Sequence, residues 1–301
     1  MSLEEFSEEL AALVEVASGS VVGVGRAGSG VVVAEGLVVT NAHNLRQEVE
    51  VYFPDGGTAQ ATVPGADLDG DVAVLSVPTG DHRPLAWPTS GRAPRLGEIV
   101  IGLSRPGGRS LRAGIGSISA LDVTFRGPGG STVTGALEHS ALLARGSSGG
   151  PLLDTEGRLL GINTHRQGDG FYLALPAGTE LKERVEALAR GEVPRRPRLG
   201  VALAPPRAAR HLRRAVGLPP RDGLLVHAVD PDGAAGRAGV RAGDLIVSVG
   251  GSQVGTVEDL AHALEAVGEG GVADLLVVRG ADEVSVAVQF DHGGPAEQGT
   301  A

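Results

Sequence analysis

Ser148 lies in the glycine-rich turn Gly146-Ser147-Ser148-Gly149-Gly150, which is followed by an apolar, strand-like segment. Glycines at these places let the backbone expose the serine hydroxyl. They also leave the amides of Gly146 and Ser148 free to point at one spot, the arrangement that stabilises the oxyanion of an acyl-transfer intermediate. The turn therefore predicts a nucleophilic serine beside an oxyanion hole. The alternative is an ordinary surface turn, because Gly-Ser turns are abundant.

A serine hydroxyl becomes a good nucleophile near neutral pH only with an imidazole base and a carboxylate that orients the base. His43 ends an apolar strand-like run and is the only one of the eight histidines in such a setting. Asp71 stands directly before another apolar run, where an unpaired charge would be costly. Asp67 and Asp69 compete for this role but resemble turn acids. The sequence therefore predicts a catalytic triad of His43, Asp71 and Ser148.

The elements that must position these groups are mainly short β-rich runs. Residues 2–14 have the spacing of an amphipathic helix, with Ser2 and Glu5 as its capping box. The close spacing of the later runs favours barrels or a sandwich. A second helix is expected over 180–190, ended by Gly191. The β-rich runs lie at 21–24, 31–33, 37–39, 49–53, 72–75, 99–101, 159–162 and 172–175.

A domain boundary is expected at 191–198, where prolines disfavour helix and arginines disfavour burial. The following hundred residues contain one convincing helix, which Thr256 and Asp259 cap. The polar, small-residue composition of 291–301 is typical of a disordered tail. Strands are expected near 224–226, 245–249, 275–278 and 284–288.

Composition narrows the classes of partner and cofactor. The 301-residue chain is 42% hydrophobic and 21% charged, the balance of a globular protein. Its formal net charge of −10 argues against a nucleic-acid partner, because phosphate binding needs a concentrated basic surface. The sequence has no cysteine, which excludes disulfides and thiolate nucleophiles. We expect protein or peptide partners, and the motifs imply no metal and no organic cofactor.

The amino-terminal sequence also bears on the cellular compartment of the protein. It is acidic where a secretory signal is basic, and no later apolar run is long enough to span a bilayer. The expected location is therefore the cytoplasm, or the periplasm or extracellular space if the natural amino terminus is longer.

Together these segments resemble the HtrA/DegP family of trypsin-like serine proteases, in which the triad has the same order along the chain. The resemblance extends through Gly28-Ser29-Gly30-Val31-Val32, 114–120 and Gly161-Ile162-Asn163-Thr164. The run 238–246 and the helix after Thr256 resemble a PDZ domain. This resemblance implies a mainly β chain, with a chymotrypsin-like double β-barrel followed by a smaller α+β PDZ domain. The expected boundaries are a helical segment at 1–18, a protease domain at 19–190, a linker at 191–198, a PDZ domain at 199–290 and a tail at 291–301.

The resemblance also implies the binding residues. The last strand of such proteases pairs with the substrate backbone, which points to Gly161, Ile162, Asn163 and Thr164 and to the loop 164–170. Leu142 and Leu143 are expected to line the primary specificity pocket, and leucines without a buried acid favour a small or medium aliphatic side chain. In the PDZ domain, Leu199, Gly200 and Val201 are expected to bind the carboxylate of a peptide C-terminus, while the peptide adds as a strand to the sheet edge.

The function implied is endopeptidase action on unfolded or damaged proteins in quality control, by a homotrimer joined through its amino-terminal segment. Three positions depart from the usual sequence of the family: Ser140 replaces an aspartate, Arg145 replaces a proline and Ser147 replaces an asparagine. These departures motivate the alternative of a catalytically inactive, HtrA-like peptide-binding or chaperone protein with a misformed oxyanion loop. A third hypothesis is a scaffold that acts mainly through its PDZ-like domain.

Overall fold

The computed structural model describes residues 2–88, 93–127, 132–168, 170–193, 197–204, 217, 221–268 and 270–290. The chain forms two compact units, Met1–Pro194 and Arg195–Ala301, and each is described by itself. The expected tail at 291–301 and the centre of the expected linker at 194–196 lie outside the described residues.

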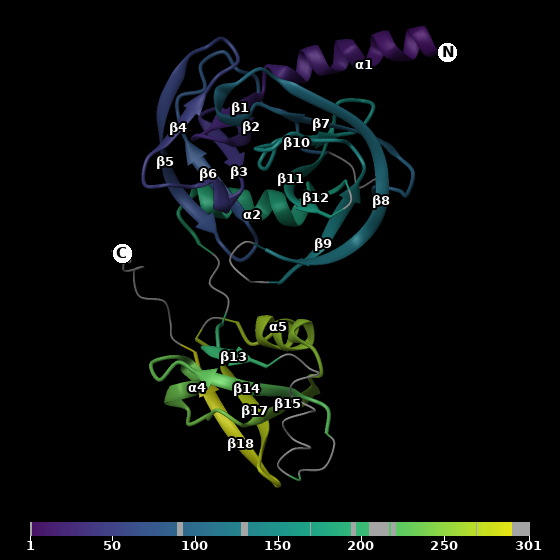
Figure 1. The fold of residues 1–301 in the computed structure, drawn as a ribbon. Coiled ribbons are helices and arrows are strands. Elements are labelled where there is room, and N and C mark those ends of the chain that lie inside the picture. Colours follow the sequence, from purple (N-terminus) through teal and green to yellow (C-terminus); the bar gives the residue numbers. More distant parts are fainter. Residues whose placement is uncertain are drawn as a thin grey trace. The chain divides into compact units, whose positions relative to one another are not determined.

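The first unit begins with a closed six-stranded barrel whose strand order is β1-β2-β3-β6-β5-β4 (Figure 1). Valine-rich runs form it because β-branched side chains suit a pleated, buried surface. Val22, Val32 and Val38 are fully buried inside it. The strands are β1 (Val21–Val24), β2 (Gly28–Ala34), β3 (Leu37–Thr40), β4 (Val49–Tyr52), β5 (Thr58–Asp67) and β6 (Val72–Ser76).

A second closed barrel follows, with the strand order β10-β11-β12-β9-β8-β7. Its largest fully buried side chains include Ile101, Leu152 and Leu173. Two closed antiparallel barrels in sequence are the double-barrel fold that was expected, and the mainly β fold class is confirmed. The strands are β7 (Ile99–Ser104), β8 (Arg112–Arg126), β9 (Thr132–His139), β10 (Pro151–Leu153), β11 (Leu159–Gln167) and β12 (Phe171–Pro176).

Two α-helices flank the barrels. Helix α1 (Leu3–Ser18) has the expected capping box but runs four residues beyond the expected end at 14. Helix α2 (Thr179–Ala189) lies against β5 and β6 and buries Leu181, Val185 and Leu188 (Figure 1). Gly191, at a φ of 81°, lets the last turn close, because its amide donates to the carbonyl of Leu188.

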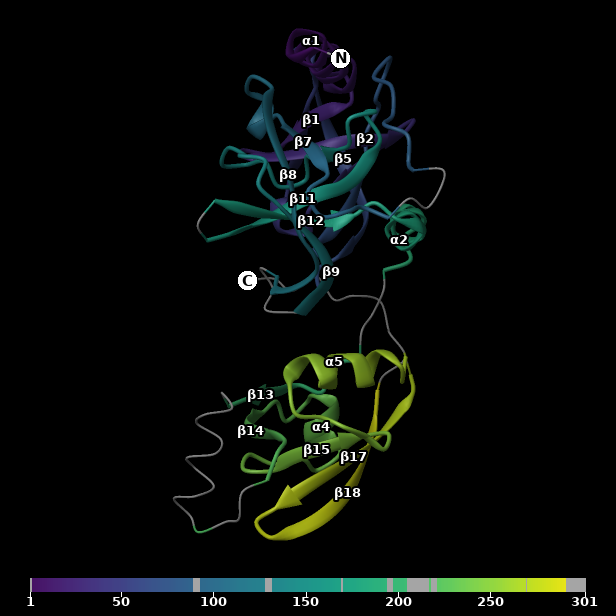
Figure 2. The ribbon, with the colours of Figure 1, turned by 90° about the vertical axis from the view of Figure 1, so that its right-hand side faces the viewer.

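The second unit is a six-stranded sheet whose main path is β13-β14-β15-β17-β18, with β16 paired to β15. Helix α5 (Val257–Glu265) begins with the expected capping box of Thr256 and Asp259, and it lies along one side of the sheet (Figure 2). Strand β13 pairs only with β14 among the described strands, so it forms an edge. The elements are β13 (Val201–Leu203), β14 (Leu224–Val229), α4 (Ala234–Arg237), β15 (Leu245–Val249), β16 (Ser252–Gln253), β17 (Val272–Arg279) and β18 (Asp282–Gln289).

Within the described residues, no helix has both the length and the apolar character needed to cross a membrane.

Leu188 is the place where the packing of α2 can be tested. Its side chain is fully buried in the core of the first unit. We predict that Leu188→Ala lowers the free energy of unfolding of this unit by about 2 to 5 kcal/mol, because it leaves a cavity. Chemical denaturation followed by circular dichroism measures the change, with Lys182→Ala on the exposed face of α2 as the control. Equal stability of the two variants would contradict the packing described.

Candidate active site

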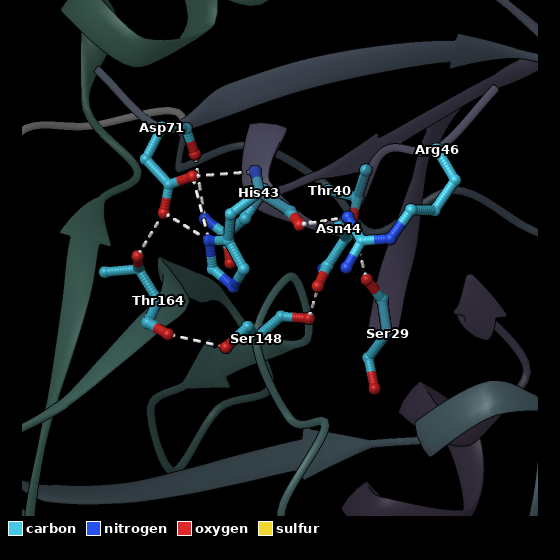
Figure 3. Close-up of polar contacts among 9 residues, drawn as sticks. Ser29, Thr40, His43, Asn44, Arg46, Asp71, Ser148 and Thr164 are labelled. Atoms are coloured by element: carbon cyan, nitrogen blue, oxygen red, sulfur yellow. Dashed lines mark hydrogen bonds and ion pairs between the residues drawn. The ribbon is translucent and has the colours of Figure 1, made fainter. Parts of the chain in front are cut away.

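The carboxylate of Asp71 is the centre of the site. It accepts hydrogen bonds from His43 Nδ1 at 2.9 Å, from the His43 backbone amide at 3.1 Å and from the Thr164 hydroxyl at 2.6 Å (Figure 3). Asp71 is 1% exposed, so these donors replace the water that a buried charge has lost. Its φ of 55° lies in the left-handed region, which aspartate tolerates better than most residues.

The His43 ring is fixed at the end of β3 by a short 3₁₀ turn, Ala42–Asn44. A carboxylate can only accept hydrogen bonds, so the ring nitrogen that faces Asp71, Nδ1, carries the hydrogen. Nε2 is then the unprotonated nitrogen, which is the form that a general base needs. Asn41 strengthens the arrangement because its side-chain amide donates to the backbone carbonyl of Asp71 at 2.9 Å.

The Ser148 hydroxyl donates to the backbone carbonyl of Thr164 at 2.6 Å. Its own carbonyl accepts from the Ser29 amide at 3.0 Å and from the Asn44 side chain at 2.9 Å, so the first barrel holds the serine in place. Figure 3 shows the His43 ring between Asp71 and Ser148. The drawn contacts include no hydrogen bond between the ring and the hydroxyl, so a rotation about the Ser148 Cα–Cβ bond is required to direct the hydroxyl at the ring.

The loop before Ser148 is held by contacts that the sequence did not reveal. Ser147 is 4% exposed, and its hydroxyl lies 2.7 Å from the Ala144 carbonyl and 2.9 Å from the Ser104 hydroxyl. The carbonyl of Gly146 accepts from the Ser29 hydroxyl at 2.8 Å. The serine that stands in place of the usual asparagine therefore anchors the loop from inside the second barrel.

Backbone geometry in this loop requires glycine. Gly146 has a φ of 89°, and a Cβ there would lie 1.9 Å from the carbonyl oxygen of Ala27. Within the described part of the chain, neither the amide of Gly146 nor that of Ser148 donates a hydrogen bond. Both amides are therefore free to donate a hydrogen bond, as the donors of an oxyanion hole must be.

A pocket of about 300 Å³ opens beside Ser148. Of the residues expected to bind substrate, Leu143, Asn163 and Thr164 line it, and so do His165 and Arg166 of the expected loop 164–170. Its wall also includes Tyr172 and Leu173, which the sequence analysis missed. These two residues belong to β12, the neighbour of β11, and strand pairing is not visible in one sequence.

The structure does not bring three of the predicted substrate contacts to this pocket or to a free strand edge. Leu142 does not line the pocket, and it is 71% exposed. Gly161 and Ile162 are buried in the middle of the sheet, where β10 pairs on one side of them and β12 on the other. No edge is left there for a substrate strand.

The backbone of Asn163 cannot pair with a substrate strand as expected, because it already forms hydrogen bonds within the protein. Its amide donates to Gly150 at 2.8 Å and its carbonyl accepts from Gly149 at 2.7 Å. Its side chain reaches the pocket. The free edge of β11 therefore begins at Thr164, three residues later than expected.

Asp67 is not the ordinary turn acid that the sequence suggested. It is 2% exposed, accepts from the amides of Asp69 and Gly70, and lies 3.4 Å from the Arg184 guanidinium of α2. A Cβ at Gly70 would lie 2.3 Å from the Asp67 carboxylate. This ion pair fixes the turn that directly precedes Asp71, and only glycine fits beside it.

His139 is the last residue of β9 in the second barrel. Its ring is fully buried, and Nε2 lies 3.0 Å from Asn163 Oδ1. Burial lowers the pKa of His139 from 6.5 to about 4. The ring is therefore neutral near neutral pH, with its hydrogen on Nε2, because an amide oxygen can only accept.

In the second unit, the structure places Leu199, Gly200 and Val201 at the start of the edge strand β13. Leu199 is 4% exposed and Gly200 has a φ of 72°. The carbonyls of Leu199 and Gly200 accept from Ala235 and Asp230, each at 2.8 Å, which fixes the bend before the strand. A cavity of about 800 Å³ in this unit lies elsewhere, between β15, β16 and the start of α5.

The described residues contain no group of three or more His, Asp or Glu side chains placed to hold a metal ion.

Comparisons with known proteins agree with this architecture. Residues 28–162 match the family model of the trypsin-like peptidase domain, and residues 225–279 match that of the PDZ domain. A probable periplasmic serine endoprotease, DegP-like, from Halomonas elongata is 30% identical over 269 residues, which are 87% of this chain and 55% of the relative. The mitochondrial serine protease HTRA2 of Bos taurus is 33% identical over 257 residues, 79% of this chain and 55% of the relative.

Among solved structures, the HtrA-type protease AlgW with a decapeptide has a TM-score of 0.73 at 23% identity. The match covers 95% of this chain and 99% of that one. The chain thus contains a trypsin-like peptidase domain followed by a PDZ domain. The expected resemblance to HtrA/DegP-like serine proteases is confirmed. The chain spans about half the length of the two curated relatives.

The buried His139 predicts how stability depends on pH. Below pH 6.5 the unfolded chain binds a proton on this ring, whereas the folded chain stays neutral down to about 4. Stability therefore falls as the pH is lowered through this window, by about 3 kcal/mol from this group alone. We predict that His139→Gln removes this part of the pH dependence. Denaturant unfolding from pH 7 to 4 measures it, and parallel curves for the two proteins would contradict the assignment.

Proposed function

We propose that the chain is a serine endopeptidase that cleaves unfolded or damaged proteins, with His43, Asp71 and Ser148 as its catalytic triad. The observation that carries the proposal is the hydrogen-bonded Asp71 carboxylate. Through it, the imidazole of the first barrel is joined to Thr164, whose carbonyl holds the Ser148 hydroxyl of the second barrel. We assign this activity to residues 19–190 and peptide binding to residues 199–290, with 191–198 between them.

In the first half of the reaction, His43 Nε2 takes the proton of the Ser148 hydroxyl while Oγ attacks the carbonyl carbon of the substrate. The amides of Gly146 and Ser148 hold the resulting oxyanion. The imidazolium then gives its proton to the departing amine, the C–N bond breaks and an ester of Ser148 remains. Asp71 stabilises the positive ring throughout.

In the second half, a water molecule loses a proton to His43 and attacks the ester. The proton then returns to Ser148 as the acid product leaves. The hydrogen bond from Ser148 to Thr164 must break at the start of each cycle. An incoming substrate amide provides the replacement donor for the Thr164 carbonyl, so binding itself releases the hydroxyl toward His43.

Two open strand edges support unfolded chains and peptides as the partners. The edge of β11 from Thr164 onward and the edge strand β13 can each accept an extended segment, which folded proteins rarely offer. We assign the C-terminus of a peptide to Leu199, Gly200 and Val201 in the PDZ domain. No cofactor takes part in the proposed reaction. The relatives' names, which include a periplasmic protease, support a compartment outside the cytoplasm for this chain in preference to the cytoplasm.

We also propose that the chain assembles as a homotrimer through α1. Phe6, Leu10 and Leu13 pack on the core of their own unit, so this face is not free. Leu3 and Val16 are 88% and 83% exposed, which leaves apolar surface for a neighbouring subunit.

Replacement of both exposed residues, Leu3→Glu with Val16→Glu, is expected to convert a trimer into monomers, because charges are costly in an apolar contact. Analytical ultracentrifugation measures the mass, and Ser18→Ala at the end of α1 is the control. A monomeric parent protein, or a variant that stays trimeric, would contradict this assembly.

A fluorophosphonate probe tests the proposed activity. We predict covalent labelling of Ser148 and cleavage of unfolded β-casein by the parent protein. Ser148→Ala abolishes labelling, and His43→Ala slows it by at least about a thousandfold, because the base is lost. Ser119→Ala, an exposed serine on β8, serves as the control and is labelled like the parent. Retained peptide binding without labelling would favour the catalytically inactive binding protein or the PDZ scaffold instead.

A further inference from the structure

Three side chains form a row across neighbouring strands of the second barrel. Arg166 on β11 lies opposite Tyr172 on β12, which lies opposite His139 on β9. The Arg166 guanidinium carbon is 5.8 Å from the centre of the Tyr172 ring. The rings of Tyr172 and His139 stack with their centres 5.9 Å apart. Residues directly opposite each other on a sheet point to the same face, which explains the row.

The inner two members of the row are fixed. The Tyr172 hydroxyl donates to the Leu143 carbonyl at 2.7 Å, and the His139 ring bonds to Asn163 at 3.0 Å. Tyr172 is 6% exposed and His139 is fully buried. The outer member, Arg166, is exposed. The row thus holds a guanidinium at the mouth of the pocket, where a cation over an aromatic face is stabilised.

The charge of Arg166 has no counterion in the described part of the chain. Its guanidinium there lies over the Tyr172 ring, and no ion pair between it and a carboxylate is found. Arg145 and His165 line the same pocket, and none of the described residues that line it is acidic. On a chain whose net charge is −10, this cleft is a locally basic site.

The register of the free edge places one substrate residue beside Arg166. The P1 residue, whose carbonyl is attacked, must lie at Ser148 and hence beside Thr164. A parallel strand would run back along residues 162 and 163, where β10 and Gly149-Gly150 already occupy the edge. The substrate therefore runs antiparallel, and the P3 residue, two positions before P1, lies opposite Arg166.

We propose that Arg166, held by Tyr172 and His139, forms a subsite that selects an acidic side chain at the P3 position of the substrate. The opposite side chains of such a pair are about 5 Å apart at Cβ, within reach of an ion pair between guanidinium and carboxylate. This inference rests on the proposed peptidase function. It places the subsite at the mouth of the pocket beside Ser148, next to the part that Leu143 and Leu173 line, so an acidic P3 residue is compatible with an aliphatic P1 residue.

Matched peptides test the subsite. A cleaved segment is first located by mass spectrometry in a digest of unfolded β-casein, and it is then synthesised as internally quenched peptides with Glu, Gln or Lys at P3. We expect kcat/KM for the Glu peptide to exceed that for the Gln peptide by about threefold, the scale of an exposed ion pair. The Lys peptide is expected to be cleaved more slowly than the Gln peptide. High salt reduces both differences because it screens the charges.

Variants assign the preference to Arg166. Arg166→Gln equalises the Glu and Gln peptides, and Arg166→Glu reverses the order of the Glu and Lys peptides. Arg112→Gln, an exposed arginine on β8 away from the pocket, keeps the preference of the parent. A thermal melt of each variant shows whether it is folded, and its fluorophosphonate labelling rate shows whether the triad is intact.

The outcomes of these experiments distinguish failure of the Arg166 subsite from failure of the proposed peptidase function. If Ser148 is labelled and β-casein is cleaved, but the three peptides are cleaved equally, the subsite is overturned and the peptidase function stands. The same holds if Arg166→Glu leaves the preference unchanged. If Ser148 is not labelled and β-casein stays intact, both proposals fall.

Discussion

The organisation of the first unit depends on one buried carboxylate. Asp71 accepts hydrogen bonds from His43, which belongs to the first barrel, and from Thr164, which belongs to the second. Neither barrel alone supplies all of its hydrogen-bond donors. Because an unpaired buried charge is costly, the carboxylate links the docking of the two barrels to the orientation of the imidazole.

Support for this carboxylate extends outward in the same way. The turn before Asp71 is fixed by Asp67, which lies against Arg184 of α2, and α2 is in turn packed into the core by Leu188. The nucleophile is held from the other side, where Ser29 and Asn44 bind the Ser148 carbonyl and Ser147 anchors the oxyanion loop. The reacting groups thus come from turns that rigid barrels hold in place.

Much of the fold could be predicted because its signals are local. Capping boxes at Ser2 and Thr256, the helix end at Gly191 and the valine runs of the first barrel each depend on a few adjacent residues. Strand β5 was missed and strand β8 was only partly predicted, because neither has such a local signal. Strand β5 is exposed or only partly buried over most of its length, so it lacks the apolar run that marks its neighbours, and β8 mixes glycine with exposed side chains.

The candidate site was less predictable where it depends on pairing between strands. The types of His43, Asp71 and Ser148 and their settings were informative, since each lies at a turn next to an apolar strand. Which residues of β11 keep a free edge depends on where β10 ends, and the sequence placed that edge three residues too early. Arg166 and Tyr172 became meaningful only once the register of β11 and β12 was known.

The central claim is that Asp71 holds the His43 ring with its hydrogen on Nδ1 and leaves Nε2 free to act as the base. Nitrogen-15 NMR of the histidine ring, recorded at a pH where His43 is neutral, tests it most directly. The account predicts a hydrogen-bonded Nδ1–H signal for His43 that is lost in Asp71→Asn. A neutral ring with its hydrogen on Nε2, unchanged by that substitution, would contradict it.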